Sequence, residues 1–69
     1  MNLRRTMYKI QTALNMQGRR VKINQYQHWS DVRQGMVTKF SISEAGQTII
    51  ETYQAAEAVR ALAEMLGGD

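Results

Sequence analysis

The sequence predicts a small α+β domain in which two helices pack on one face of a three-stranded antiparallel sheet. Three observations indicate this fold: an apolar helical stripe near each end of the chain, alternating segments between them, and short glycine-containing turns separating those segments. Because short connections favour antiparallel pairing of consecutive strands, the expected order is α-β-β-β-α with a meandering sheet. Residues 1–69 are expected to form one domain around a single core.

The first helix is predicted between Asn2, a favourable N-cap residue, and Gly18, a favourable C-terminal stop. Its apolar stripe consists of Leu3, Met7, Ile10 and Leu14. Two heptads are few for a coiled coil, so packing on the domain's own sheet is the favoured interpretation. Tyr8 and Met16 lie off this stripe. Packing at the rim of the core is favoured for both over a basic-aromatic patch that contacts nucleic acid.

The first strand is predicted within residues 19–29, where Val21 and Ile23 share one face. Trp29 falls on the same face after two glutamines, which predicts either a bulge or a strand end that runs past the core. Residues 30–35 are then expected to form a hairpin loop, with Asp31 and Gly35 as its turn residues.

The second strand is predicted at residues 36–43, and its core-facing side chains are Met36, Thr38, Phe40 and Ile42. A tight turn follows at residues 44–46, where Gly46 can take a positive φ. The third strand is expected at residues 47–53. Because Ile49 and Ile50 are adjacent, the pattern leaves open which of them points into the core.

The second helix gives the strongest periodic signal in the chain. Its predicted N-cap is Gln54, with Glu57 three residues later, and its stop is the pair Gly67 and Gly68. The apolar stripe consists of Ala55, Val59, Leu62 and Leu66, flanked by Ala56, Ala58, Ala63 and Met65. The opposite side carries Glu57, Arg60 and Glu64.

Composition and charge indicate the cellular compartment of the protein and the kind of partner it binds. The chain has no cysteine, which fits a reducing compartment, and it has neither a membrane-length apolar run nor a secretory signal core, so a cytoplasmic protein with no membrane role is expected. Residues 1–40 contain eight basic residues and one acidic residue, a net charge of +7, whereas residues 41–69 carry −4. This asymmetry indicates either a basic surface for nucleic acid or pairing between opposite ends of neighbouring copies, although solvated charge alone can also produce it.

Residues with catalytic or ligating chemistry are few. His28 is the only histidine, and with no cysteine or second histidine it predicts no metal site. A dyad of His28 with Asp31 is disfavoured, the glutamates are scattered, and no glycine-rich phosphate loop opens a helix. We therefore expect a protein that is not an enzyme and holds no cofactor or metal.

The predicted function is a non-enzymatic accessory role in which a basic, open sheet face binds DNA or RNA. That face is expected to be open to water and to carry Lys22, Asn24, Tyr26, His28, Lys39, Ser41 and Tyr53. The candidate nucleic-acid-binding residues are Arg19, Arg20, Lys22, Tyr26, His28, Arg33 and Lys39. The alternative is a protein-interaction module that self-associates through an edge strand or an apolar helix face, with Trp29 or Tyr8 as an anchor.

The order α-β-β-β-α and the chain length resemble those of the double-stranded-RNA-binding domain. That family contacts RNA through a Lys-Lys-x-x-Lys run at the start of its last helix and a Gly-Pro-x-His loop between its first strands. The corresponding segments here, residues 54–57 and 30–35, contain neither motif, so the resemblance implies the fold without that mode of binding. Residues 26–31, 36–39 and 51–53 also resemble small uncharacterised proteins of Gram-positive bacteria and their prophages, a resemblance that implies no activity.

Overall fold

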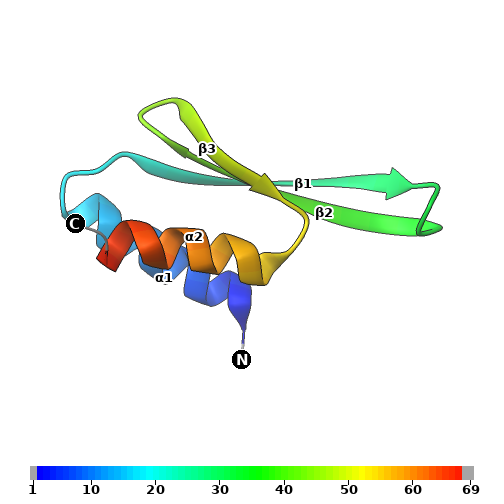
Figure 1. Cartoon of the computed structure of the whole chain (residues 1–69), viewed down its shortest axis with the longest axis horizontal. Helices are drawn as coiled ribbons and strands as arrows, with labels where there is room; N and C mark the ends of the chain where they lie inside the picture. Colours follow the sequence, from blue (N-terminus) through cyan, green and yellow to red (C-terminus); the bar gives the residue numbers. More distant parts are fainter. Residues whose placement is uncertain (1, 68–69) are drawn as a thin grey trace.

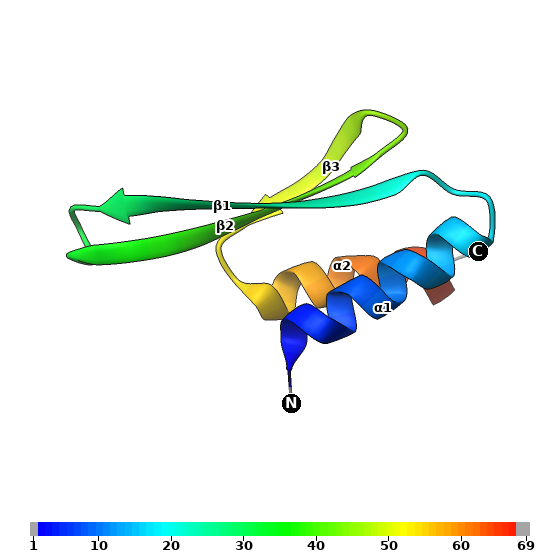
Figure 2. The ribbon, with the colours of Figure 1, turned by 180° about the vertical axis from the view of Figure 1, so that it is seen from behind.

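The computed structural model describes residues 2–67 and has the predicted order of elements. The elements are α1 (Leu3–Met16), β1 (Val21–Ser30), β2 (Gly35–Glu44), β3 (Gln47–Thr52) and α2 (Ala55–Gly67). The strands form one antiparallel sheet in the order β1-β2-β3. Both helices lie on the same side of this sheet, and no part of residues 2–67 covers the other side (Figures 1 and 2). The predicted α+β fold is confirmed.

Helix α1 begins and ends where the sequence predicts. The side-chain oxygen of Asn2 accepts a hydrogen bond of 3.1 Å from the Arg5 backbone N–H. Gly18, with φ of +91°, follows the last turn in the left-handed region that favours glycine. Met7 and Leu14 are fully buried, so the predicted stripe does face the core. The two helices also contact each other along their length.

Helix α2 starts after Gln54, whose carbonyl accepts from the N–H groups of Glu57 and Ala58. Thr52, and not the predicted N-cap residue Gln54, supplies the side chain that hydrogen-bonds Glu57 at the start of this helix. Its hydroxyl donates to the Glu57 carboxylate at 2.6 Å and accepts from the Gln54 N–H at 3.1 Å. Thr52 therefore joins the end of β3 to the first turn of α2.

The buried face of α2 is rotated from the predicted stripe. Ala58 and Leu62 are fully buried and Met65 packs against the core, whereas Leu66 is 38% exposed. The prediction that Leu66 faces the core was wrong because α2 packs against α1 as well as against the sheet. The small side chain of Ala58 allows that close approach.

The sheet places its apolar side chains above the helices. Val21, Ile23, Phe40 and Ile42 are buried. The β1–β2 register is regular, but the β2–β3 register shifts between Ile42 and Ser43, where Ile42 pairs with Ile50 and Ser43 pairs with Thr48. Ile49 is the extra residue, is 51% exposed, and leaves Ile50 as the side chain that packs against the core.

The two hairpin turns use positive φ angles differently from the prediction. In the β2–β3 turn, Gly46 has φ of +83° as predicted, and Ala45 also has a positive φ of +53°, as a two-residue type I′ turn requires. In the β1–β2 turn the residue with positive φ is Gln34, at +55°. Gly35 already belongs to β2 and pairs with Ser30, so its prediction as a turn residue was wrong.

The β1–β2 hairpin extends well beyond the helices, as Figure 1 shows. Trp29 and Met36 lie opposite each other in this overhang, on the side facing the helix layer, and they are 57% and 61% exposed. Because the β1–β2 register has no shift, the strand end that runs past the core, and not a bulge, explains the position of Trp29.

Candidate functional site

The uncovered face of the sheet carries most of the predicted site residues. Lys22, Tyr26 and His28 alternate along β1 with the buried Val21 and Ile23, so they point away from the helices. Lys39 of β2 lies directly opposite Tyr26 and therefore points to the same side. Tyr53 follows β3 immediately, next in register after the pair of Phe40 with Thr52.

Three exposed aromatic rings gather at the middle and outer end of this face. The His28 and Tyr53 rings meet edge to face over the intervening strand β2, with centroids 5.7 Å apart. His28 Nε2 lies 3.1 Å from the Tyr53 hydroxyl, and Nδ1 lies 3.2 Å from the Trp29 carbonyl. Because that carbonyl can only accept, a hydrogen bond to it requires the tautomer with the proton on Nδ1, in which Nε2 accepts from the Tyr53 hydroxyl. Tyr26 and Tyr53 are 53% and 54% exposed.

Cations lie beside these rings. The Lys39 ammonium is 3.3 Å from the carboxylate of Glu51, its neighbour on β3. Within residues 2–67, Glu51 is the one carboxylate on the uncovered face of the sheet, and this ion pair offsets its charge. Lys22 is exposed on the same face. The face therefore combines accessible rings with an excess of positive charge.

Ser41 departs from the expectation that this face is open to water. It is only 5% exposed, although it points to the uncovered side. It lies on the central strand between Asn24 and Glu51, which both have longer side chains.

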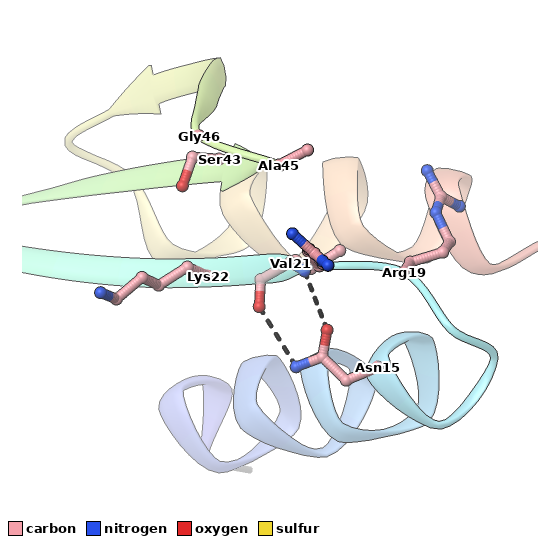
Figure 3. Close-up of a pocket in the computed structure, with 8 residues that line it drawn as sticks. Asn15, Arg19, Val21, Lys22, Ser43, Ala45 and Gly46 are labelled. Atoms are coloured by element: carbon pink, nitrogen blue, oxygen red, sulfur yellow. Dashed lines mark hydrogen bonds between the residues drawn. The ribbon is translucent and has the colours of Figure 1, made fainter.

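Two hollows mark the ends of the uncovered face. The one at the hairpin end has a volume of about 450 Å³ and is lined by His28, Ser30, Arg33, Val37, Tyr53 and Gln54. The one at the opposite end is lined by Asn15, Arg19, Arg20, Val21, Lys22, Ser43, Ala45 and Gly46. Two of these lining residues, Arg20 and Lys22, are exposed cations and none is acidic, which suits an anionic group. Figure 3 shows Lys22 pointing along the sheet and Arg19 pointing the other way, toward α2.

Arg19 occupies a structural position. Its Nε and Nη2 groups each donate a 2.8 Å hydrogen bond to the Glu44 carboxylate, and Nη1 donates to the Met65 carbonyl at 2.8 Å. These bonds hold the start of β1, the end of β2 and the last turn of α2 together. The hydrogen bond from Arg19 lowers the pKa of the Glu44 carboxyl group, and the same bond raises the pKa of Arg19. The guanidinium is thus occupied within the fold.

The remaining candidates are distributed as follows. Arg20 is exposed at the start of β1, and Arg33 is exposed in the hairpin turn, so the structure places them at opposite ends of the uncovered face. His28 contacts Tyr53, while the Asp31 carboxylate accepts from the Trp29 indole N–H at 3.0 Å. His28 and Asp31 each bond to a different partner.

Tyr53 was predicted on this face but was left out of the candidate binding residues. The strand register supports its inclusion, because the row across the three strands that contains Tyr26 and Lys39 continues to Tyr53. Asn15 was also missed, since its contact with Val21 depends on how α1 docks beside β1.

Within residues 2–67, no helix is long and apolar enough to cross a membrane. Compared with protein-family models, with curated proteins and with solved structures, the chain shows no significant match.

Proposed function

We propose that this protein binds single-stranded nucleic acid through the uncovered face of its sheet. The observation that carries the proposal is the group of exposed rings, Tyr26, His28 and Tyr53, flanked by Lys22 and Lys39 on the same face of the sheet. Cations neutralise phosphates, and aromatic rings stack on bases that are not already stacked in a duplex. This combination favours a single strand over a double helix.

The surface is long enough to follow a chain of several nucleotides. From Lys22 to Ser30, β1 spans about 26 Å at roughly 3.3 Å per residue. The hollow beside Arg20 and Lys22 suits a phosphate at one end, and the hollow beside His28 and Arg33 suits a phosphate or base at the other. Arg19 is left out of this surface because Glu44 and the Met65 carbonyl hold its guanidinium.

The proposal predicts how steeply the affinity for single-stranded nucleic acid falls as the salt concentration rises. Each phosphate that a cation neutralises contributes a slope of about −0.7 to the logarithm of affinity against the logarithm of salt concentration for a single strand. If Arg20, Lys22, Arg33 and Lys39 each contact one phosphate, the slope is about −3. Replacing Lys22 and Lys39 with glutamate should bring it to about −1.4 or closer to zero.

The test is a titration of labelled single-stranded and double-stranded DNA and RNA with the protein, followed by fluorescence anisotropy at several salt concentrations. A label on the oligonucleotide is preferable to Trp29 as the probe, because Trp29 points to the helix side of the hairpin. We expect saturable binding to single strands, weakened at least tenfold by the Lys22→Glu/Lys39→Glu double substitution.

A matched control reverses two cations on the outer side of α1. Arg5→Glu with Lys9→Glu changes the net charge by the same amount but leaves the sheet face intact. It should retain most of the affinity, whereas Tyr26→Ala should lose affinity with little change in the salt slope, because stacking is not a charge interaction. Equal losses in both charge variants would refute the sheet-face site, and absence of binding at low salt would refute the function.

A further inference from the structure

Among residues 2–67, the outer edge of β1 has no strand beside it, so its outward backbone groups are unpaired along most of its length. The Arg20 carbonyl accepts from the Ala45 N–H at 2.9 Å, so this carbonyl points toward β2. The next residue, Val21, turns both of its backbone groups the opposite way, to the side chain of Asn15. Because the direction alternates along an antiparallel strand, the odd-numbered residues of β1 point outward. Those beyond Val21 are Ile23, Gln25, Gln27 and Trp29.

Asn15 closes this edge at one end only. Its amide oxygen accepts from the Val21 N–H at 2.8 Å, and its amide nitrogen donates to the Val21 carbonyl at 3.2 Å (Figure 3). A single side chain thus imitates the pair of hydrogen bonds that a neighbouring strand would supply. The rest of the edge is straight, with no bulge in its pairing to β2. Such an edge is a template for another strand.

We infer that two copies of this chain pair antiparallel through β1, about a two-fold axis at Tyr26. In this register Ile23 lies opposite Trp29 of the second copy, and Gln25 lies opposite Gln27. All four outward-pointing residues then find partners, and Val21 stays outside the paired region with Asn15. A shift of two residues in one direction sets Trp29 against the occupied Val21, and in the other direction it sets Ile23 against the hairpin turn.

The side chains agree with this register. Trp29 is 57% exposed in an overhang with no helix beneath it, and pairing places it beside Ile23 of the second copy, above that copy's α1.

Charge and area also fit a reversible pair. Lys22, the one charged residue of β1, lies opposite the uncharged Ser30 of the second copy, so no like charges face each other within the paired strands. Tyr26 and Trp29 each offer about 100 Å² of exposed side chain. The contact is small beside the roughly 800 Å² per partner of a standard interface, so the dimer should dissociate on dilution.

Pairing would join two uncovered faces into one six-stranded surface, with Tyr26 of both copies at its centre and His28 beside Asn24 of the second copy. That the joined surface binds one nucleic-acid strand across both copies rests on the proposed function. The pairing itself does not, so it is tested without nucleic acid.

A cysteine at position 26 tests the register directly. The chain has no cysteine, so a single introduced thiol can form a disulfide only with another copy. Tyr26 would face itself in a non-hydrogen-bonded pair, with Cα atoms about 4.5 Å apart, within disulfide range. The control is Asn24→Cys, whose two copies would lie roughly 13 Å apart, beyond that range. Under mild oxidation, Tyr26→Cys should form covalent dimers at least ten times faster than Asn24→Cys.

Sedimentation equilibrium of the unaltered chain should show a dimer that dissociates on dilution. Gln27→Pro removes an outward N–H that β2 does not use, and it should raise the dissociation constant at least tenfold, whereas Gln27→Ala should not. Equal disulfide formation at positions 24 and 26, or a monomer at every concentration, would overturn the inference. Loss of nucleic-acid binding with the dimer intact would instead remove only the proposed function.

Discussion

Replacing Asn15 with alanine tests how much one side chain at the edge of β1 contributes to the fold. The substitution removes both hydrogen bonds to Val21, at 2.8 and 3.2 Å, and leaves the Val21 backbone groups to water. It also changes a helix position from asparagine to alanine, which favours the helix. The two effects have opposite signs, so the net change depends on their sizes.

The hydrogen bonds are expected to dominate. Two bonds at about 1 kcal/mol each contribute about 2 kcal/mol. The higher helix propensity of alanine stabilises the folded protein by about 0.5 kcal/mol. The free energy of unfolding should therefore fall by about 1.5 kcal/mol in total. A 69-residue domain has a total stability of roughly 3–10 kcal/mol, so this loss is easily measured.

Urea unfolding at low protein concentration is the suitable assay. With a slope near 1 kcal/mol per molar urea for a domain this small, the midpoint should fall by about 1.5 M. Thr12→Ala is the matched control, because the Thr12 hydroxyl bonds only to the Tyr8 carbonyl of its own helix. It should leave the midpoint unchanged or raise it slightly. An unchanged midpoint for Asn15→Ala would refute the claim that Asn15 holds the strand edge.

Three further predictions concern the fold. Ile50→Ala should lower the free energy of unfolding by about 2 kcal/mol and Ile49→Ala by less than about 0.5 kcal/mol, and equal effects in chemical denaturation would contradict the bulge. Ala45→Gly should stabilise the protein by about 0.5 kcal/mol, since glycine takes the φ of +53° without strain, and a lower melting temperature would count against the type I′ turn. The pKa of Glu44 is lowered in the folded protein, so its stabilising contribution is complete above the ordinary value of 4.5 and is lost as pH falls through the lowered value. Glu44→Gln should therefore show less acid destabilisation over that interval, and an identical pH profile of unfolding would argue against the contact with Arg19.

The fold could be predicted because its local signals agree with one another. The stripe of α1, the alternation of Val21 with Ile23, and the stops at Gly18 and Gly46 all depend on residues close in sequence. Such patterns determine which face of an element is apolar, and a small domain has few ways to bury two helices and three strands.

The predictions that were wrong concern features that depend on contacts between elements distant in sequence. Leu66 and Met65 are equally apolar, and only the docking of α2 against α1 decides which one is buried. Nothing in the sequence distinguishes Arg19 from the other cations. Its partners, Glu44 and the Met65 carbonyl, belong to elements much later in the chain. The positive φ at Gln34 likewise could not be predicted, because the residue at that position is not a glycine.

The overhang of the β1–β2 hairpin has a consequence for how the molecule opens. Hydrogen exchange reports local openings, and a ribbon without helices beneath it has few buried contacts to resist them. Amides near Val37 should therefore exchange through small openings, whereas those near Ile42 should require almost complete unfolding. We therefore expect the end of the hairpin, which carries His28, Arg33 and the exposed Trp29, to open as a separate cooperative unit. Substitutions there can alter what the surface binds while the core keeps its stability.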